Sequence, residues 1–264
     1  MVIPRKNNLS SDGFLIEAIR SYWNDHIHDL EIARHPVGSE GFFKDLETYR
    51  FDKLHYLPRL VDFAGFEGKR LLEVGCGVGI DLSRFAKGGA RVTGVDLADK
   101  SIELAKKNFS QQKLKGSLIR GNGEALDFDN DSFDCVFAHG VIQYTADATA
   151  MVSEIHRVLK PGGMAILMVY NRRSWLNFLS KTLGVSIEHQ DAPVIKTYSR
   201  KEFNELLRPF DRVTVIPERF PVKSKLQKGK KAIVFNRVFV PLFNLIPRSL
   251  TRNSGWHLLA FAYK

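Results

Sequence analysis

The sequence predicts an α/β fold built on an open, mostly parallel β-sheet with helices. From Lys69 onward, short apolar runs alternate with segments of helical period, as in parallel βαβ units. The first apolar run leads into a glycine-rich turn at 75–79, and the second ends on Asp96. A length of 264 residues is enough for one such domain with additional segments.

Each element follows from the same pattern. Strands are expected at 70–74, 91–96, 116–120, 133–138, 164–170, 212–216 and 256–264. Helices are expected at 79–87, 99–109 and 145–160, the last ending before Pro161, and Ser199 and Glu202 have the spacing of a capping box. Residues 1–66 are predicted to form a helical N-terminal lid over an α/β domain at 67–264. Two stretches, 171–197 and 218–255, break the alternation and are expected to be insertions on the substrate side.

The net charge of +10 is concentrated in the C-terminal third. Residues 218–255 hold nine Lys/Arg and one Asp/Glu, and residues 171–217 hold eight and five. Such a basic region suits nucleic acid, an acidic substrate or an anionic membrane surface.

Composition also bears on compartment and metals. Cys76 and Cys135 are expected to be buried free thiols in a reducing compartment. No signal-peptide h-region and no membrane-spanning apolar run is found, so a cytoplasmic protein is expected. His26, His28 and His35 have neither nearby cysteines nor an H-x-x-x-H pair, so packing or solvated histidines are favoured over a zinc site, and no metal is expected.

The turn at 75–79 indicates a nucleoside-bearing ligand. Its glycines permit a left-handed backbone and let a ligand approach main-chain N–H groups. Asp96 follows Gly75 by 21 residues, where a carboxylate can accept hydrogen bonds from both hydroxyls of a ribose. A dinucleotide fingerprint would need a glycine at Ile80. Glu73 would repel a pyrophosphate but suits an ammonium group, so the pattern favours a cofactor with a charged amine.

Three stretches carry a resemblance to a known family: LLEVGCGVG (71–79), VTGVDLADKSIELAKKN (92–108) and SFDCVFAHGVIQYTADATAMVSEIHRVLKPGG (132–163). Together they resemble class I S-adenosylmethionine (SAM)-dependent methyltransferases. The branch they resemble (methyltransferase type 11) contains ubiquinone/menaquinone-biosynthesis C-methyltransferases and many natural-product enzymes. The resemblance covers about 69–170. It implies a seven-stranded, mostly parallel Rossmann-like sheet with helices on both faces and an antiparallel last strand at 256–263. It also implies SAM as cofactor and S-adenosylhomocysteine (SAH) as product.

The resemblance assigns cofactor contacts position by position. The methionine moiety and turn correspond to Glu73, Gly75, Cys76, Gly77 and Gly79, the ribose to Asp96, the adenine face to Leu97, the loop after the third strand to Asn122, Gly123 and Glu124, and the methyl-donor end to Ala138, His139 and Gly140. The family usually has Asp-Ala and then Glu in that loop. Asn122 replaces the aspartate, and its side-chain oxygen can still accept a hydrogen bond from the adenine amine.

Methyl transfer mainly requires positioning and the removal of a proton. His139 is the candidate base, since its expected place is a strand end beside the methyl group and its pKa suits proton removal. The alternative is a structural histidine. Tyr144 is a second catalytic candidate that could orient a substrate, although ordinary packing explains it as well. In the lid, Tyr22 and Trp23 are expected to close over the cofactor, and Arg50 to pair with a carboxylate.

The stretch KSKLQKGKKAIVFNRVFVPLFNLIP (223–247) leaves three interpretations open. It is a surface-capping insertion with solvated lysines, a site for an amphipathic substrate, or a peripheral membrane contact. Nucleic acid is least favoured, because no base-extrusion motif or RNA-binding module is present.

The sequence thus predicts a SAM-dependent methyltransferase for a small or amphipathic organic acceptor. A catalytically silent SAM-fold scaffold is the alternative, and an RNA methyltransferase is a weaker one.

Overall fold

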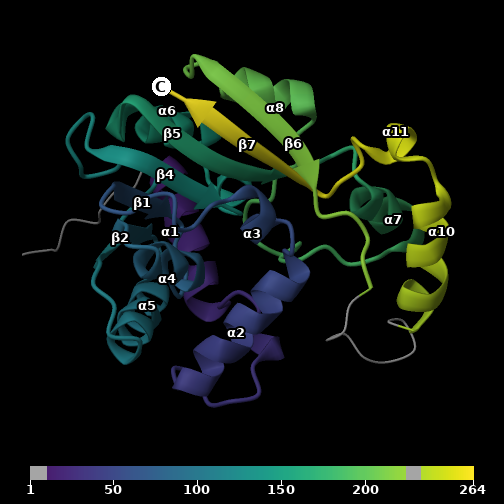
Figure 1. The fold of residues 1–264 in the computed structure, drawn as a ribbon, viewed down its shortest axis with the longest axis horizontal. Helices are drawn as coiled ribbons and strands as arrows, with labels where there is room; N and C mark the ends of the chain where they lie inside the picture. Colours follow the sequence, from purple (N-terminus) through teal and green to yellow (C-terminus); the bar gives the residue numbers. More distant parts are fainter. Residues whose placement is uncertain (1–10, 224–232) are drawn as a thin grey trace, which may run out of the picture.

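A computed structural model describes residues 11–223 and 233–264 of the chain. Its centre is a seven-stranded sheet of order β3-β2-β1-β4-β5-β7-β6 (Figure 1). The strands are β1 (Arg70–Val74), β2 (Arg91–Asp96), β3 (Ser117–Arg120), β4 (Phe133–His139), β5 (Leu159–Tyr170), β6 (Arg212–Glu218) and β7 (His257–Tyr263). β7 runs antiparallel to both β5 and β6, whereas β1 to β5 pair in parallel. The predicted sheet and its antiparallel last strand are confirmed.

Helices cover both faces of the sheet. They are α1 (Ser11–Asp25), η1 (Leu30–Ile32), α2 (Glu40–Lys53), α3 (Leu57–Leu60), α4 (Ile80–Lys87), α5 (Asp99–Gln111), η2 (Ile142–Tyr144), α6 (Ala148–Val158), α7 (Trp175–Leu183), α8 (Arg200–Leu206), the π-helical turn η3 (Phe235–Phe239), α10 (Val240–Leu245) and α11 (Arg248–Thr251). No helix among these described segments is both long and apolar enough to cross a bilayer.

Two hydrophobic cores follow from the alternation of side chains along the strands. Leu72 and Val74 of β1 pack on one face with residues of α6 and α8. Leu71 of the same strand packs on the other face with residues of α3, α4 and α5. The covered faces leave the carboxyl edge of the parallel strands as the place where an open α/β sheet binds ligands.

Several predicted boundaries were wrong by a few residues. The helix predicted at 145–160 is α6, and it ends at Val158 because Leu159 already pairs with Phe133 in the sheet. Within the predicted N-terminal lid, α2 ends at Lys53 and only the short α3 follows before β1. The capping box of Ser199 and Glu202 forms as predicted at the start of α8.

The N-terminal segment is not a uniform layer. Leu54, Tyr56 and Leu57 are buried in the core beneath the sheet together with α4 and α5. The part that contacts α4 and α5 from outside consists of α1 and α2. Helices α1 and α2 therefore lie on α4 and α5, whereas Leu54, Tyr56 and Leu57 belong to the core.

The two predicted insertions come together beyond the ends of β6 and β7. Figure 1 shows α7, from 171–197, beside α10 and α11, from 218–255, away from the α4 and α5 side of the sheet. The lysines at 225–231, part of the predicted basic stretch, lie outside the described residues.

Candidate active site

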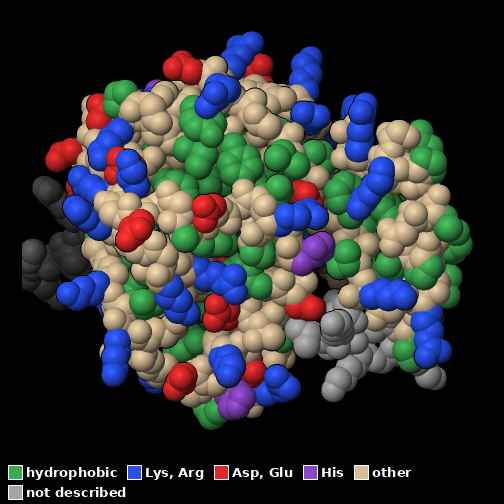
Figure 2. Space-filling view, viewed as in Figure 1, with side chains coloured by type: hydrophobic (Ala, Val, Ile, Leu, Met, Phe, Trp, Pro, Cys, Tyr) green, Lys and Arg blue, Asp and Glu red, His purple; other side chains and the backbone are tan. Residues whose placement is uncertain are grey.

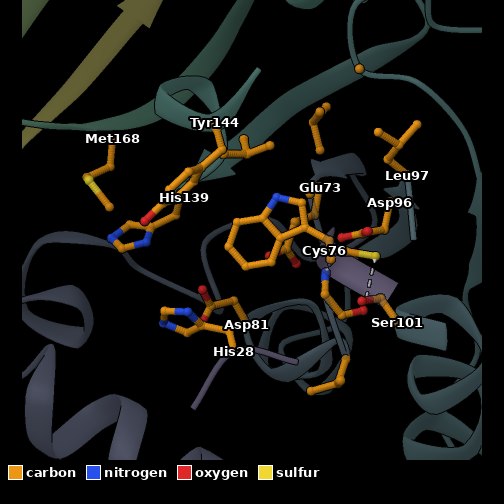
Figure 3. Close-up of a pocket in the computed structure, with 18 of the residues that line it drawn as sticks. His28, Glu73, Cys76, Asp81, Asp96, Leu97, Ser101, His139, Tyr144 and Met168 are labelled. Atoms are coloured by element: carbon orange, nitrogen blue, oxygen red, sulfur yellow. Dashed lines mark hydrogen bonds between the residues drawn. The ribbon is translucent and has the colours of Figure 1, made fainter. Parts of the chain in front are cut away.

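A cavity of about 210 Å³ lies at the carboxyl edge of β1, β2 and β4. Its walls include all of the predicted cofactor residues except Gly79 and Ala138, namely Glu73, Gly75, Cys76, Gly77, Asp96, Leu97, Asn122, Gly123, Glu124, His139 and Gly140. Figure 3 shows Asp96 and Leu97 at one end and His139 with Met168 at the other. After the roles predicted from the sequence, the first is called the cofactor end. The second, which also includes Lys53, Glu188, Arg219 and His257, is called the acceptor end.

All three glycines of the turn have a positive φ, but the surroundings of each glycine differ. A Cβ on Gly75 (φ 71°) would lie 2.7 Å from the side chain of Val141, so glycine is needed for packing. Gly77 (φ 51°) has nothing within 4 Å of that position, although it lines the cavity. Gly79 (φ 74°) starts α4, packs near Phe109 and does not line the cavity. Gly77 is therefore the glycine that leaves room for a ligand.

Asp96 closes the turn from the end of β2. One carboxylate oxygen accepts the N–H of Gly77 at 2.8 Å and the other accepts that of Ala98 at 2.9 Å. Burial raises the pKa of Asp96 above its ordinary value, and these backbone N–H groups oppose the rise. Since each carboxylate oxygen can accept more than one hydrogen bond, both can still accept from a ligand's hydroxyls.

Glu73 is a buried carboxyl group with an unmet acceptor. It is 4% exposed, and its Oε2 has no hydrogen-bond partner among the described residues. Burial, reinforced by Asp81, raises its pKa well above the ordinary value. Arg50 lies close by and binds both oxygens of Asp81, through its Nε at 2.6 Å and through its Nη2. A cation in the cavity would satisfy Glu73 and favour its ionised form.

Hydrogen bonds and close packing hold the loop after β3 in place. Asn122 Oδ1 accepts the N–H of Glu124 at 3.0 Å, so this oxygen already has one partner. Glu124 accepts the N–H of Ala146 at 2.8 Å and the hydroxyl of Thr145. A Cβ on Gly123 would lie 2.7 Å from the side chains beneath it. Glu124 thus links the loop after β3 to the loop after η2.

His139 ends β4 and belongs to a chain of hydrogen-bonding groups. Its Nε2 lies 2.8 Å from the hydroxyl of Tyr56, which lies 2.6 Å from Nδ1 of His257. Its Nδ1 is 3.3 Å from Arg50. Burial and the neighbouring Arg50 hold the pKa of His139 well below its usual 6.5. The imidazole is therefore neutral, the form that can accept a proton.

Charged groups continue the chain along the acceptor end. Arg219 lies 3.1 Å from Nε2 of His257 and 2.6 Å from Glu188. Lys53 pairs with Glu188 at 3.1 Å and with Asp29 at 3.0 Å. Burial opposes ionisation of Glu188, but Arg219 and Lys53 outweigh it and hold its pKa well below the ordinary value. The acceptor end is thus a network of paired charges, with the Lys53 and Arg219 side chains only 10% and 14% exposed.

Two residues that line this end, and His189, which follows the lining residue Glu188, have left-handed backbones although they are not glycines. They are Asp29 (φ 59°), His189 (φ 51°) and Arg219 (φ 59°). Such conformations are unfavourable for L-residues and concentrate at functional sites. At Arg219 the backbone oxygen also accepts the indole N–H of Trp175 at 2.9 Å, which helps to hold the residue in place.

The predicted lid residues occupy different positions. Trp23 lines the cavity, and its ring lies edge-on to Tyr144 at 5.0 Å. Tyr22 does not line it; its hydroxyl donates to Asp191 at 2.9 Å in the 171–197 insertion. Tyr144 also lines the cavity, and its hydroxyl is 3.0 Å from that of Tyr170. Helix α1 and the first insertion therefore meet above the cavity.

The three N-terminal histidines have separate partners. His26 stacks on Tyr22 at 4.1 Å between ring centroids, and His35 lies 2.9 Å from Asp45. His28 Nδ1 is 2.7 Å from Nε2 of His189. Within 11–223 and 233–264, no group of three metal-ligating side chains is suited to hold an ion. Cys76 and Cys135 are buried free thiols, as predicted.

Several acceptor-end residues were missed by sequence reasoning. Tyr56 was assigned to the lid, and His257 to a last strand of unspecified role. His257 had a usable signal: an antiparallel last strand begins at the carboxyl edge, and His257 pairs with Tyr170 there. Arg219, Lys53 and Glu188 had none, because their meeting depends on how 171–197 and 218–255 fold.

Comparisons with known proteins agree with this geometry. Residues 72–167 match a family model described as a methyltransferase domain. A ubiquinone biosynthesis O-methyltransferase of Alkalilimnicola ehrlichii is 29% identical over 154 residues, covering 56% of this chain and 62% of the relative. The protein of that name from Cereibacter sphaeroides is 37% identical over 160 residues, covering 57% and 59%. The chain thus spans about six tenths of the length of these relatives.

Solved structures share the fold at low identity. A SAM-dependent methyltransferase of Thermotoga maritima gives a TM-score of 0.61 at 18% identity, covering 93% of this chain and 99% of that one. Magnesium protoporphyrin IX methyltransferase of Synechocystis, solved with bound SAH, gives 0.60 at 16%, covering 94% and 99%. Residues 72–167 therefore match a methyltransferase domain, and the fold of the chain is that of SAM-dependent methyltransferases of known structure. The predicted likeness to ubiquinone-biosynthesis methyltransferases is confirmed as a distant homology, but these relatives are O-methyltransferases, whereas the sequence had pointed to C-methyltransferases.

Proposed function

We propose that this protein transfers a methyl group from SAM to a small or amphipathic organic acceptor. The observation that carries the proposal is the shared cavity. One wall holds the open Gly77 turn and the unmet acceptor of Glu73, and the far wall holds the neutral His139. The names of the ubiquinone-biosynthesis relatives support a small-molecule acceptor.

The residues at the cofactor end fit the parts of SAM. Asp96 has acceptor capacity left for two ribose hydroxyls, and Leu97 offers an apolar side chain for the adenine. Glu73 would accept from the ammonium group, which would satisfy its partnerless oxygen. Arg50 uses only part of its five donors on Asp81 and His139, and those remaining suit a carboxylate.

SAM supplies an electrophilic methyl group on a sulfonium that leaves readily. The chain's own task is to hold the acceptor in line and to take its proton. We assign proton removal to His139, whose burial keeps it neutral. Tyr56 acts as a positioning residue, because its hydroxyl fixes one ring nitrogen of His139. Tyr144 and Trp23 would cover the reacting groups and exclude water.

Calorimetric titration with SAH tests cofactor binding. We expect the parent protein to bind, Gly77→Arg to lose binding because the side chain fills the cavity, and Asp96→Ala to bind more weakly. Gly162→Arg is the matched control, since Gly162 also has a positive φ (74°) with nothing within 4 Å but does not line the cavity. No heat with the parent protein, or equal loss in both arginine variants, would refute the assignment.

Methyl transfer itself needs a second experiment. Incubation with methyl-labelled SAM and cell extract, followed by mass spectrometry, should place label in a low-molecular-weight product. SAH binding without transfer to any acceptor would instead establish the catalytically silent scaffold. Label found only in RNA would establish the nucleic-acid alternative.

A further inference from the structure

The two insertions carry most of the exposed large hydrophobic side chains. Of fourteen such side chains in the described part of the chain, three lie in 171–197 and eight in 218–255. The three others, Phe14, Val37 and Ile119, are far apart in the sequence. Figure 2 shows hydrophobic and basic side chains together along the edge where Figure 1 places α10 and α11. Elements α7, η3, α10 and α11 together are called the insertion face here.

The helix formed by η3 and α10 is apolar on two sides. Phe235 and Phe239 point toward the protein, with ring centroids 6.0 and 5.7 Å from that of Trp175. On the outer side, Val238, Leu242 and Leu245 are 50%, 58% and 79% exposed. A surface helix normally presents polar residues to water. The exposed apolar side chains on the outer side of this helix therefore favour contact with an apolar partner.

The insertion face is also cationic. Residues 219–255 contain no Asp or Glu. Arg237, Arg252 and Lys181 are exposed, and among the described residues none of them forms an ion pair. Arg248 lies 4.2 Å from the ring of Phe220 instead of beside a carboxylate. Apolar side chains flanked by arginine and lysine are the composition of a surface that meets anionic lipid headgroups.

We propose that the insertion face docks on an anionic lipid bilayer. The outer hydrophobic side chains enter the boundary between headgroups and acyl chains, while the arginines meet lipid phosphates. A second copy of this chain fits poorly, because a two-fold contact would bring together two copies of the same cationic surface, and residues 219–255 offer no Asp or Glu to pair with its arginines. The docking does not depend on methyl transfer and extends beyond the proposed function.

Docking would place the acceptor end of the cavity near lipid. Glu188 belongs to the same insertion as α7, and Arg219 begins the segment that leads to η3. Trp175 of α7 holds Arg219 through its indole N–H. The cavity wall and the insertion face are thus physically connected.

Vesicle flotation with the full chain tests the proposal. Vesicles of phosphatidylcholine alone are compared with vesicles that contain one quarter phosphatidylglycerol. We expect binding to the anionic vesicles, weakened by salt. Arg237→Gln/Arg252→Gln should weaken partitioning about thirtyfold, from about 1 kcal/mol per basic residue. Leu242→Ser/Leu245→Ser should weaken it at least about tenfold.

Matched controls change equivalent residues elsewhere. Val37→Ser/Ile119→Ser removes exposed hydrophobic residues outside the insertions, and Lys106→Gln/Lys115→Gln removes exposed charges on another surface. Both should partition like the parent protein. Absence of binding to anionic vesicles, or equal losses in the control variants, would overturn the proposal. So would a dimer in sedimentation that Leu242→Ser/Leu245→Ser dissociates without any vesicle binding.

Discussion

The cofactor end of the cavity is made by strand ends that are neighbours in the sheet, whereas the acceptor end is made by segments far apart in the sequence. Gly77 and Asn122 follow β1 and β3, and Asp96 is the last residue of β2. The register of these strands is set by parallel pairing. Lys53, Glu188 and Arg219 come from α2 and from the two insertions, and they are held by ion pairs.

This difference suggests how proteins that share one fold can bind the same cofactor and yet differ in their acceptor. Ladder hydrogen bonds place the cofactor residues, so the insertions can vary without disturbing them. The acceptor residues instead depend on left-handed backbones at Asp29, His189 and Arg219. If this division is correct, substitutions at the two ends should affect different measured quantities.

Loss of the candidate base should have the largest effect. His139→Ala should lower the rate of methyl transfer by about 10² to 10⁴, the usual contribution of a positioned acid or base. SAH affinity should change little, because His139 lies at the acceptor end. Transfer rates and SAH calorimetry measure the two effects, with exposed His55→Ala as control. Loss of SAH binding alone would favour the structural interpretation of His139.

Removal of the Tyr56 hydroxyl, which contacts His139, should lower the rate of methyl transfer less than removal of His139 itself. Tyr56→Phe should lower the maximal rate by about 10 to 10², because small misplacements of a reacting group are costly. The KM for SAM should not change, which separates positioning from general destabilisation. Tyr198→Phe is a matched control, since the buried Tyr198 hydroxyl has no partner among the described residues. Equal effects of the two substitutions would contradict the role of Tyr56.

Arg219→Gln tests whether the acceptor end is independent of the cofactor end. Transfer should fall about tenfold, because Glu188 and His257 lose their shared partner. SAH at 100 times its Kd should still stabilise the variant by about 2.7 kcal/mol in thermal unfolding. Asp96→Ala should lose most of that stabilisation at the same SAH concentration. A similar loss in Arg219→Gln would show that the two ends are coupled.

The smallest expected effect is the change in the rate of methyl transfer with pH. A histidine with an ordinary pKa of 6.5 would lose half its activity as a base near that pH. Burial and Arg50 lower the pKa of His139, so the neutral form persists and transfer should stay nearly constant as pH falls through 6.5. Initial rates between pH 5 and 8, with circular dichroism to confirm folding, test this. A midpoint at 6.5 would contradict the assignment.

The sequence predicted most of the residues that line one end of the cavity, because the signals for that end are contiguous in the chain. The glycine spacing, Asp96 and the strand periodicity all depend on local pairing and turn geometry. Tyr56, Arg219 and Glu188 were not foreseeable in the same way, because their contacts join separate segments of the chain. Arg219 meets Glu188 across 31 positions, and the Tyr56 hydroxyl meets His257 across 201. His257 lies between these cases, since only the antiparallel register of β7 places it beside Tyr170.

A crystal structure with SAH tests the central claim most directly. The two-ended cavity predicts the ribose hydroxyls on Asp96, the adenine beside Leu97 and the sulfur directed toward His139. An adenosine bound among Lys53, Glu188 and Arg219, or SAH bound outside the cavity, would contradict the account.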